Sequence, residues 1–215
     1  MKVLVVAAHP DDEILGCGGT LLRHASLGHE IYVCIVTKSF PPMWSEEYAN
    51  TKVEEAKSVD KILGTKDRFY CDIPALHLCS SSSLEVNGKI GRVISRVKPD
   101  VVYTHSEADI NEDHRVIFNA VMVGTRPISS KIKVACFETV SSTEWNNKPF
   151  IPNFYVNIEN FVEQKIKAFL AYESEVKGFP HPRSPEGIRI MSQKRGMDIC
   201  IKNAEAFQIV RDFWV

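Results

Sequence analysis

The stretch that decides the fold is VLVVAAHPDDEILGCGG, residues 3–19. It opens with four consecutive apolar residues at positions 3–6, which is typical of a strand buried in a parallel sheet. A turn rich in charge and glycine follows, and a helical pattern runs from Gly19 to His29. We expect the glycines of this turn to let the backbone bend tightly and approach a substrate. A strand that leads through a turn into a helix predicts an α/β protein.

The rest of the chain repeats this alternation of strand-like and helical patterns. Further strands are expected at residues 31–37, 68–71, 101–104 and 133–137, with a closing strand or helix at 206–210. Further helices are expected at residues 45–63, 84–97, 112–124, 160–172 and 186–197. The segment 138–154 lacks a helical period and is expected to be a long functional loop. With 215 residues, the prediction is one Rossmann-like, three-layer domain spanning residues 1–215 with a mostly parallel β-sheet.

Composition excludes several classes of partner. The 26 lysines and arginines nearly balance the 27 aspartates and glutamates, so no positive field is available to hold nucleic acid or an anionic membrane. The apolar run at residues 3–8 is too short for a secretion signal or a membrane span. The six cysteines are scattered without a C-x-x-C pair, which suits a reducing compartment. We therefore expect a cytoplasmic protein without a membrane span.

Four of the five residues at positions 9–13 are ionisable, and they directly follow the first expected strand. In open parallel sheets, ligands bind where the carboxyl ends of the strands meet. Charges crowded into such a turn are costly unless something compensates them, and a divalent metal would do so. His9 and Asp12 are three residues apart, so that both can reach one ion while Asp11 points elsewhere.

A second polar cluster, HSEADINEDHR at residues 105–115, follows the expected fourth strand and so belongs to the same edge. We expect His114 to be the third ligand. Two imidazoles and one carboxylate leave a position for water, which is typical of catalytic zinc, although iron or another transition metal fits the same ligands. Asp11 is then the expected general base, and Asp113 is expected to orient the ring of His114 through a hydrogen bond.

With AHPDDE at residues 8–13 and DHR at residues 113–115, the chain resembles the PIG-L/LmbE-type zinc-dependent de-N-acetylases over nearly its full length. Members of this family remove acetyl groups from N-acetylglucosamine conjugates. By the family's pattern, His9 and Asp12 bind zinc and Asp11 is the base. The resemblance implies an amino-sugar N-deacetylase that acts on a small sugar conjugate, and it suggests a homo-oligomer.

Asn111 departs from the family's pattern, because many members have a histidine three residues before the last zinc ligand that stabilises the oxyanion. An amide still donates a hydrogen bond, but it stabilises developing charge less than an imidazolium does. His181 is a further catalytic candidate. It and Asp11 are the two expected sources of the proton that the leaving amine needs.

Four other residues are expected to contact the substrate, each with a structural alternative. Trp145 offers a stacking face for a sugar ring or covers the core. Arg183 binds a phosphate or carboxylate of the substrate, or it makes a structural ion pair. Asp109 and His105 are polar groups near the metal, although Asp109 also suits a turn and His105 a strand end.

Three other functions fit parts of the sequence. The same metal site would serve an amidase acting on a non-sugar acyl amide, which substrate profiling distinguishes. A dinucleotide-binding module suits the expected fold, but the glycines at residues 16–19 do not form G-x-G-x-x-G. A non-catalytic metal-binding protein would make Asp11 irrelevant to any reaction.

Overall fold

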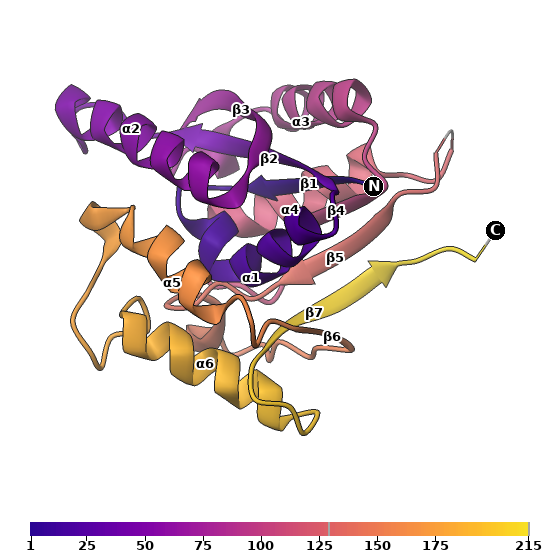
Figure 1. The fold of residues 1–215 in the computed structure, drawn as a ribbon. Coiled ribbons are helices and arrows are strands. Elements are labelled where there is room, and N and C mark those ends of the chain that lie inside the picture. The colour runs from indigo at the N-terminus through magenta and orange to yellow at the C-terminus, as the bar shows by residue number, and fades with distance from the viewer. Residues whose placement is uncertain (129, 215) are drawn as a thin grey trace.

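The computed structural model describes residues 1–128 and 130–214, and within them a seven-stranded sheet with the order β3-β2-β1-β4-β5-β7-β6 lies at the centre (Figure 1). The strands are β1 (Lys2–Ala7), β2 (Glu30–Lys38), β3 (Thr65–Pro74), β4 (Val101–His105), β5 (Lys133–Phe137), β6 (Phe154–Asn157) and β7 (Ala204–Arg211). The first five strands are mutually parallel, whereas β7 is antiparallel to both of its neighbours. The predicted α/β fold with a mostly parallel sheet is thereby confirmed.

Helices cover both faces of the sheet and give the molecule three layers (Figure 1). They are α1 (Asp12–Ser26), α2 (Glu46–Leu63), α3 (Ser83–Val97), α4 (Glu112–Gly124), α5 (Val162–Leu170) and α6 (Pro185–Met197). Alternate residues of β1 enter different cores, since Val3 and Val5 pack under α1 and α5 while Leu4 and Val6 pack under α3 and α4. Among the residues described, no helix is both long and apolar enough to cross a membrane.

Helix α1 begins at Asp12, seven residues before the start expected from sequence, and bends at Cys17. The expectation that the glycines form the turn is wrong, because they lie inside this helix. A Cβ at Gly16 would stand 2.2 Å from the ring of Phe137, and one at Gly19 would stand 2.9 Å from Ile158. The glycines therefore allow α1 to approach its neighbours closely, and that contact fixes the position of the turn before it.

The segment expected to be a loop at residues 138–154 contains a short 3-10 helix, Thr143–Trp145, and ends in the first residue of β6. Strand β6 was not expected from the sequence. It has four residues and pairs with β7 at the edge of the sheet. The expected third strand at residues 68–71 is the middle of the longer β3.

Candidate metal centre

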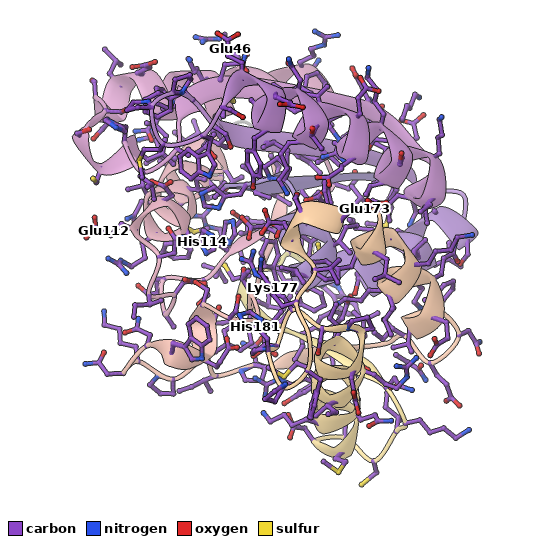
Figure 2. The ribbon with its side chains drawn as sticks, turned by 90° about the vertical axis from the view of Figure 1, so that its left-hand side faces the viewer. Glu46, Glu112, His114, Glu173, Lys177 and His181 are labelled. Carbon is purple, nitrogen blue, oxygen red and sulfur yellow. The ribbon has the colours of Figure 1, made fainter. Side chains whose placement is uncertain are left out.

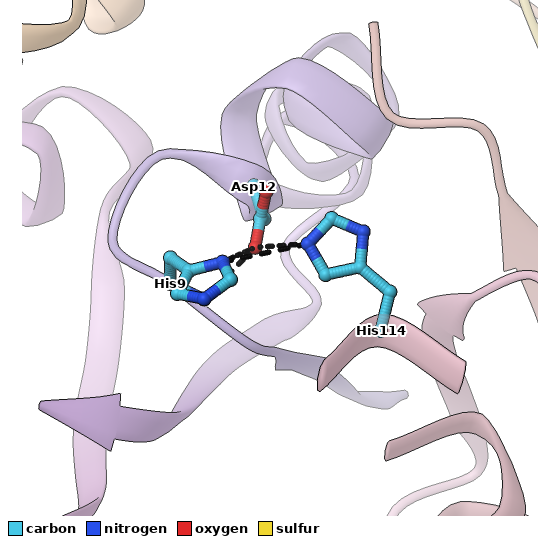
Figure 3. Close-up of side chains that lie close together, drawn as sticks. All are labelled: His9, Asp12 and His114. Carbon is cyan, nitrogen blue, oxygen red and sulfur yellow. Dashed lines mark hydrogen bonds and ion pairs between the residues drawn. The ribbon is translucent and has the colours of Figure 1, made fainter. Parts of the chain in front are cut away.

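The three residues expected to bind metal come together at the carboxyl edge of the sheet (Figure 3). His9 and Asp12 lie in the turn between β1 and α1, and His114 lies in the first turn of α4, which follows β4. Strands β1 and β4 are neighbours in the sheet, so their carboxyl ends bring the two segments side by side. Figure 2 looks onto this edge, with His114 labelled at the start of α4.

The spacing of the three side chains fits a tetrahedral metal. Asp12 Oδ2 lies 3.2 Å from His9 Nδ1 and 3.3 Å from His114 Nε2, and the two nitrogens are 3.4 Å apart. A tetrahedral zinc with bonds of about 2.0–2.1 Å places its ligand atoms about 3.3–3.4 Å apart. Asp12 Oδ1 is buried and has no hydrogen-bond partner within the described residues. The donor set and its geometry both suit a zinc ion.

Two carboxylates lie behind the imidazoles, in an arrangement different from the one expected. Asp109 Oδ2 is 3.0 Å from His114 Nδ1, and Asp113 Oδ2 is 3.3 Å from His9 Nε2. The expectation that Asp113 orients His114 is wrong, because consecutive residues of a helix point in different directions. Asp109 orients His114, and hydroxyls of Ser142 and Thr143 hold Asp109 in turn.

His105 and Asp109 do not take the substrate-contacting positions expected of them, because both side chains are fully buried. The ring of His105 stacks on that of His114 with centroids 3.8 Å apart. His105 Nε2 accepts the backbone N–H of Ala8 at 2.9 Å. Burial, together with the charge of His114, lowers the pKa of His105 to about 3, so this ring is neutral. Both residues support His114 from behind.

Asp11 stands beside the three candidate ligand residues, almost fully buried, with its backbone at φ 119°. Positive φ is uncommon for a residue with a side chain and costs energy that the surroundings must offset. Arg183 Nη1 lies 3.0 Å from Asp11 Oδ2. Burial raises the pKa of Asp11 to about 8, and the guanidinium of Arg183 opposes that rise.

Arg183 makes the structural ion pairs that were the alternative to a substrate contact. Besides Asp11, its Nη1 contacts Glu175 Oε2 at 2.9 Å, and its Nε donates to Ser141 Oγ at 2.7 Å. Glu175 also accepts from Tyr48 and pairs with the buried Lys52. Arg183 is therefore engaged with the protein, and it holds Asp11 from the side of the pocket.

A pocket of about 280 Å³ opens in front of His9 and Asp11. Its other lining residues are Pro10, Thr37, Ser39, Trp44, Tyr48, Lys52, Ala75, Leu76, Asn111, Glu175 and Arg183. Sequence reasoning missed Trp44 and Tyr48, whose only signal was an aromatic pair at the start of a helix that follows a strand. Asn111 caps α4, and its Oδ1 accepts the N–H of Asp113 at 2.9 Å. Its amide nitrogen is therefore the end left for a ligand.

Trp145 and His181 lie together outside the set of residues that lines this pocket. Their rings meet edge to face with centroids 6.2 Å apart, and Trp145 is 57% exposed. His181 Nδ1 accepts the backbone N–H of Arg183 at 3.1 Å. Figure 2 labels Lys177 and His181 on the segment that precedes α6. The two residues thus border the side of the site where Arg183 enters.

Comparisons with known proteins find similar sequences among proteins named as deacetylases, and a similar fold among solved structures. The uncharacterized deacetylase YaiS of Escherichia coli (strain K12) is 27% identical over 181 residues, which cover 80% of this chain and 90% of that protein. The diacetylchitobiose deacetylase of Thermococcus kodakarensis is 25% identical over 191 residues, covering 81% of this chain and 70% of that protein. Among solved structures, the conserved protein TT1542 from Thermus thermophilus superposes with a TM-score of 0.80 at 26% identity, covering 99% of this chain and 96% of that chain.

A family model supplies the identification. The model of the PIG-L family, described as GlcNAc-PI de-N-acetylase, matches residues 4–124. The match includes His9, Asp12 and His114, together with the strands and helices that position them. Because it spans more than half of the chain, the protein belongs to the PIG-L family of N-deacetylases.

Proposed function

We propose that this protein is a zinc-dependent hydrolase that removes the N-acetyl group from an N-acetylglucosamine-like conjugate, with Asp11 as general base. The observation that carries the proposal is the convergence of three ligand atoms, from His9, Asp12 and His114, within 3.2–3.4 Å of one another. A buried carboxylate that is not a ligand stands next to them and lines the same pocket. Such a pairing of an open metal site with a base suits amide hydrolysis.

The roles of the individual groups follow from their contacts. When bound, zinc polarises the acetyl carbonyl and lowers the pKa of water toward neutrality. Asp11 accepts the proton from the attacking water, while Arg183 holds its Oδ2 and fixes the direction of the carboxylate. The proton then passes from Asp11 to the leaving amine. Products are acetate and the free amino sugar.

Asn111 and His181 complete the proposed machinery. Asn111 lines the pocket, and because the cap on α4 uses its Oδ1, its amide N–H is the group that remains to donate to the oxygen on which negative charge develops. A neutral amide stabilises that charge less than a cation does. His181, beside Arg183, is the second candidate to protonate the leaving amine.

The proposal of an amino-sugar substrate rests on the relatives and on the pocket wall. One relative is named for diacetylchitobiose, a sugar with two acetylated amines. The wall provides Trp44 and Tyr48, and aromatic rings are good surfaces for the apolar face of a sugar. Trp145, which is more exposed, is proposed to contact the part of the conjugate that extends from the pocket.

The test is the release of acetate and free amine from two matched panels of N-acetyl compounds, measured with zinc-loaded protein. One panel contains N-acetylglucosamine conjugates with different aglycones, and the other contains N-acetylated amino acids and aryl amines. Release confined to the sugar panel supports the proposal. Release confined to the non-sugar panel would replace it with an amidase acting on another class of conjugate.

A further inference from the structure

Glu13 is a fully buried carboxylate next to the metal site that the roles described above leave without a function. It follows the ligand Asp12 directly, yet it lies neither in the ligand set nor among the residues that line the pocket. A charged group is taken out of water at high cost unless strong partners compensate it. The partners of Glu13 therefore indicate what it does.

One oxygen of Glu13 holds the backbone of Asp11. Glu13 Oε2 accepts the Asp11 N–H at 3.0 Å, across the turn in which Asp11 adopts φ 119°. Asp11 is also the residue before α1, but its side chain makes no cap on that helix. The Asp11 carboxylate is thus not used to cap α1, and it lies toward Arg183 and the pocket instead.

The other oxygen of Glu13 is fixed from behind by a chain of hydrogen-bonded groups. Glu13 Oε1 accepts from Tyr172 Oη at 2.6 Å and from Arg68 Nη1 at 3.1 Å. Arg68 in turn binds Asp60 through two nitrogens, at 2.7 and 2.9 Å. Because Glu13 and the guanidinium of Arg68 are both buried, these hydrogen bonds are strong and the hydrogen-bonded network is rigid. Glu13 is consequently held in place independently of any group that touches a substrate.

We infer that Glu13 is a positioning residue for the base, holding the backbone of Asp11 in a strained conformation that aims its carboxylate at the substrate. The inference rests on the proposed function in one respect, namely that Asp11 is the base. Arg183 fixes the far end of the Asp11 side chain and Glu13 fixes its backbone. The base is thereby fixed at both ends, and neither contact requires the metal.

The variant that tests this is Glu13→Gln. A glutamine has one acceptor oxygen, so it cannot accept from both Asp11 and Arg68, and either orientation turns an NH₂ group toward a donor. The matched control is Glu205→Gln. Glu205 is a buried carboxylate that also accepts two backbone N–H groups of α1, from Gly19 and Thr20, and pairs with Lys165, but it does so far along the helix from Asp11.

Both variants are expected to lower the unfolding temperature, and only Glu13→Gln is expected to change catalysis. Because a displacement of about 1 Å in a reacting group costs roughly 100-fold, kcat for acetate release should fall about 100-fold in Glu13→Gln with KM and zinc content unchanged. Glu205→Gln should keep kcat within about twofold of wild type. A Glu13→Gln protein with wild-type kcat, or one that loses its zinc, would overturn the positioning role.

Amide hydrogen exchange of the metal-free protein separates this inference from the proposed function. Exchange at Asp11 should be at least about tenfold faster in Glu13→Gln than in wild type or Glu205→Gln, because Arg68 and Tyr172 attract the single acceptor oxygen of glutamine and the NH₂ group is left facing the Asp11 N–H. If wild type releases no acetate while Asp11 exchange responds as expected, the proposed function fails and the backbone contact stands. Unchanged exchange at Asp11 would contradict the inference whatever the activity.

Discussion

At the scale of single residues, the carboxylates behind the two imidazoles decide how the candidate metal ligands His9 and His114 are oriented. Asp109 faces His114 Nδ1, and Asp113 faces His9 Nε2. Each carboxylate fixes which ring nitrogen carries the proton and leaves the opposite nitrogen for the metal. Asp109 reaches the site from the loop before α4, whereas Asp113 reaches it from the first turn of α4, so neither carboxylate can replace the other.

Asp109→Asn is expected to raise the dissociation constant for zinc by roughly 10–100-fold, the usual effect of removing such a partner. The amide keeps the size of the carboxylate, so the ring of His114 loses its charged neighbour without losing its packing. Competition with a chromogenic chelator measures the constant. Glu112→Gln, an exposed change in the first turn of α4, is the control, and equal affinities in the two variants would contradict the assigned role.

His24 gives the protein an acid-sensitive stability that is independent of the metal site. It lies against His29 and Tyr103, and burial, then His29, the N-terminus and Arg23, lower its pKa to about 4. Because the unfolded value is near 6.5, the stabilising contribution is complete above that pH and is lost as the pH falls from about 6.5 to 4.

For metal-free protein, the free energy of unfolding should therefore fall between pH 6.5 and pH 4 by about 2 kcal/mol more in wild type than in His24→Gln, after allowance for partial exposure of the ring. Glutamine keeps a hydrogen bond to Tyr103 but does not titrate. Urea unfolding at several pH values gives the comparison. Parallel curves for the two proteins would show that His24 is protonated as easily in the folded chain as in the unfolded one.

The sequence was sufficient to predict that His9, Asp12 and His114 lie together, but not which groups support them. His9 and Asp12 are close together in one turn, and the second cluster contains a histidine beside an arginine. Each of these features lies within a short stretch of sequence, so it can be found without knowing the fold. The partner of His114 depends on the direction of side chains in a helical turn that sequence spacing does not give. Trp44 and Tyr48 reach the pocket because of the path that the segment before α2 takes, which the sequence does not indicate.

At the scale of elements, the close contact between α1 and the sheet depends on Gly16. A Cβ there would stand 2.2 Å from the ring of Phe137, which is fully buried and cannot move away easily. Gly16→Ala should lower the free energy of unfolding by about 1–3 kcal/mol, the usual cost of overpacking. It should also disturb the turn at His9 and weaken zinc binding.

Gly91→Ala is the control for this change, because Gly91 lies inside α3 and a Cβ there meets no atom of the described residues within 4 Å. Alanine favours a helix over glycine by about 1 kcal/mol, so the control should stabilise the protein. Chemical unfolding of both variants decides the matter. Equal effects of the same sign would mean that helix propensity, and not contact with Phe137, governs Gly16.

The element boundaries that could not be predicted from the sequence are those at which a local conformational preference competes with tertiary packing. Glycines disfavour a helix interior, so the first helix was expected to begin only at the last of them, Gly19, but contact with Phe137 and Ile158 stabilises helix through that stretch. Strand β6 has only four residues and forms by pairing with β7, which is distant in sequence. Neither effect leaves a periodic pattern in the chain.

At the scale of the whole molecule, strand order explains why two short motifs about a hundred residues apart form one site. Strands β1 and β4 are neighbours at the point where the order reverses, with β2 on one side and β5 on the other. Parallel strands bring both following turns to one edge, and the crevice at such a reversal is the usual ligand site of open α/β sheets. Alternation of strands and helices was enough to predict this edge, whereas the antiparallel pairing of β7 and β6 was not predictable from it.

The most direct test of the account measures bound zinc and acetate release together, in wild type and in Asp11→Asn. The account expects one zinc per chain in both proteins, acetate release from an N-acetylglucosamine conjugate by wild type, and a loss of about 10²–10⁴-fold in kcat in the variant, the contribution usual for a general base. Wild-type protein that binds no zinc, or an Asp11→Asn variant that releases acetate at the wild-type rate, would contradict it.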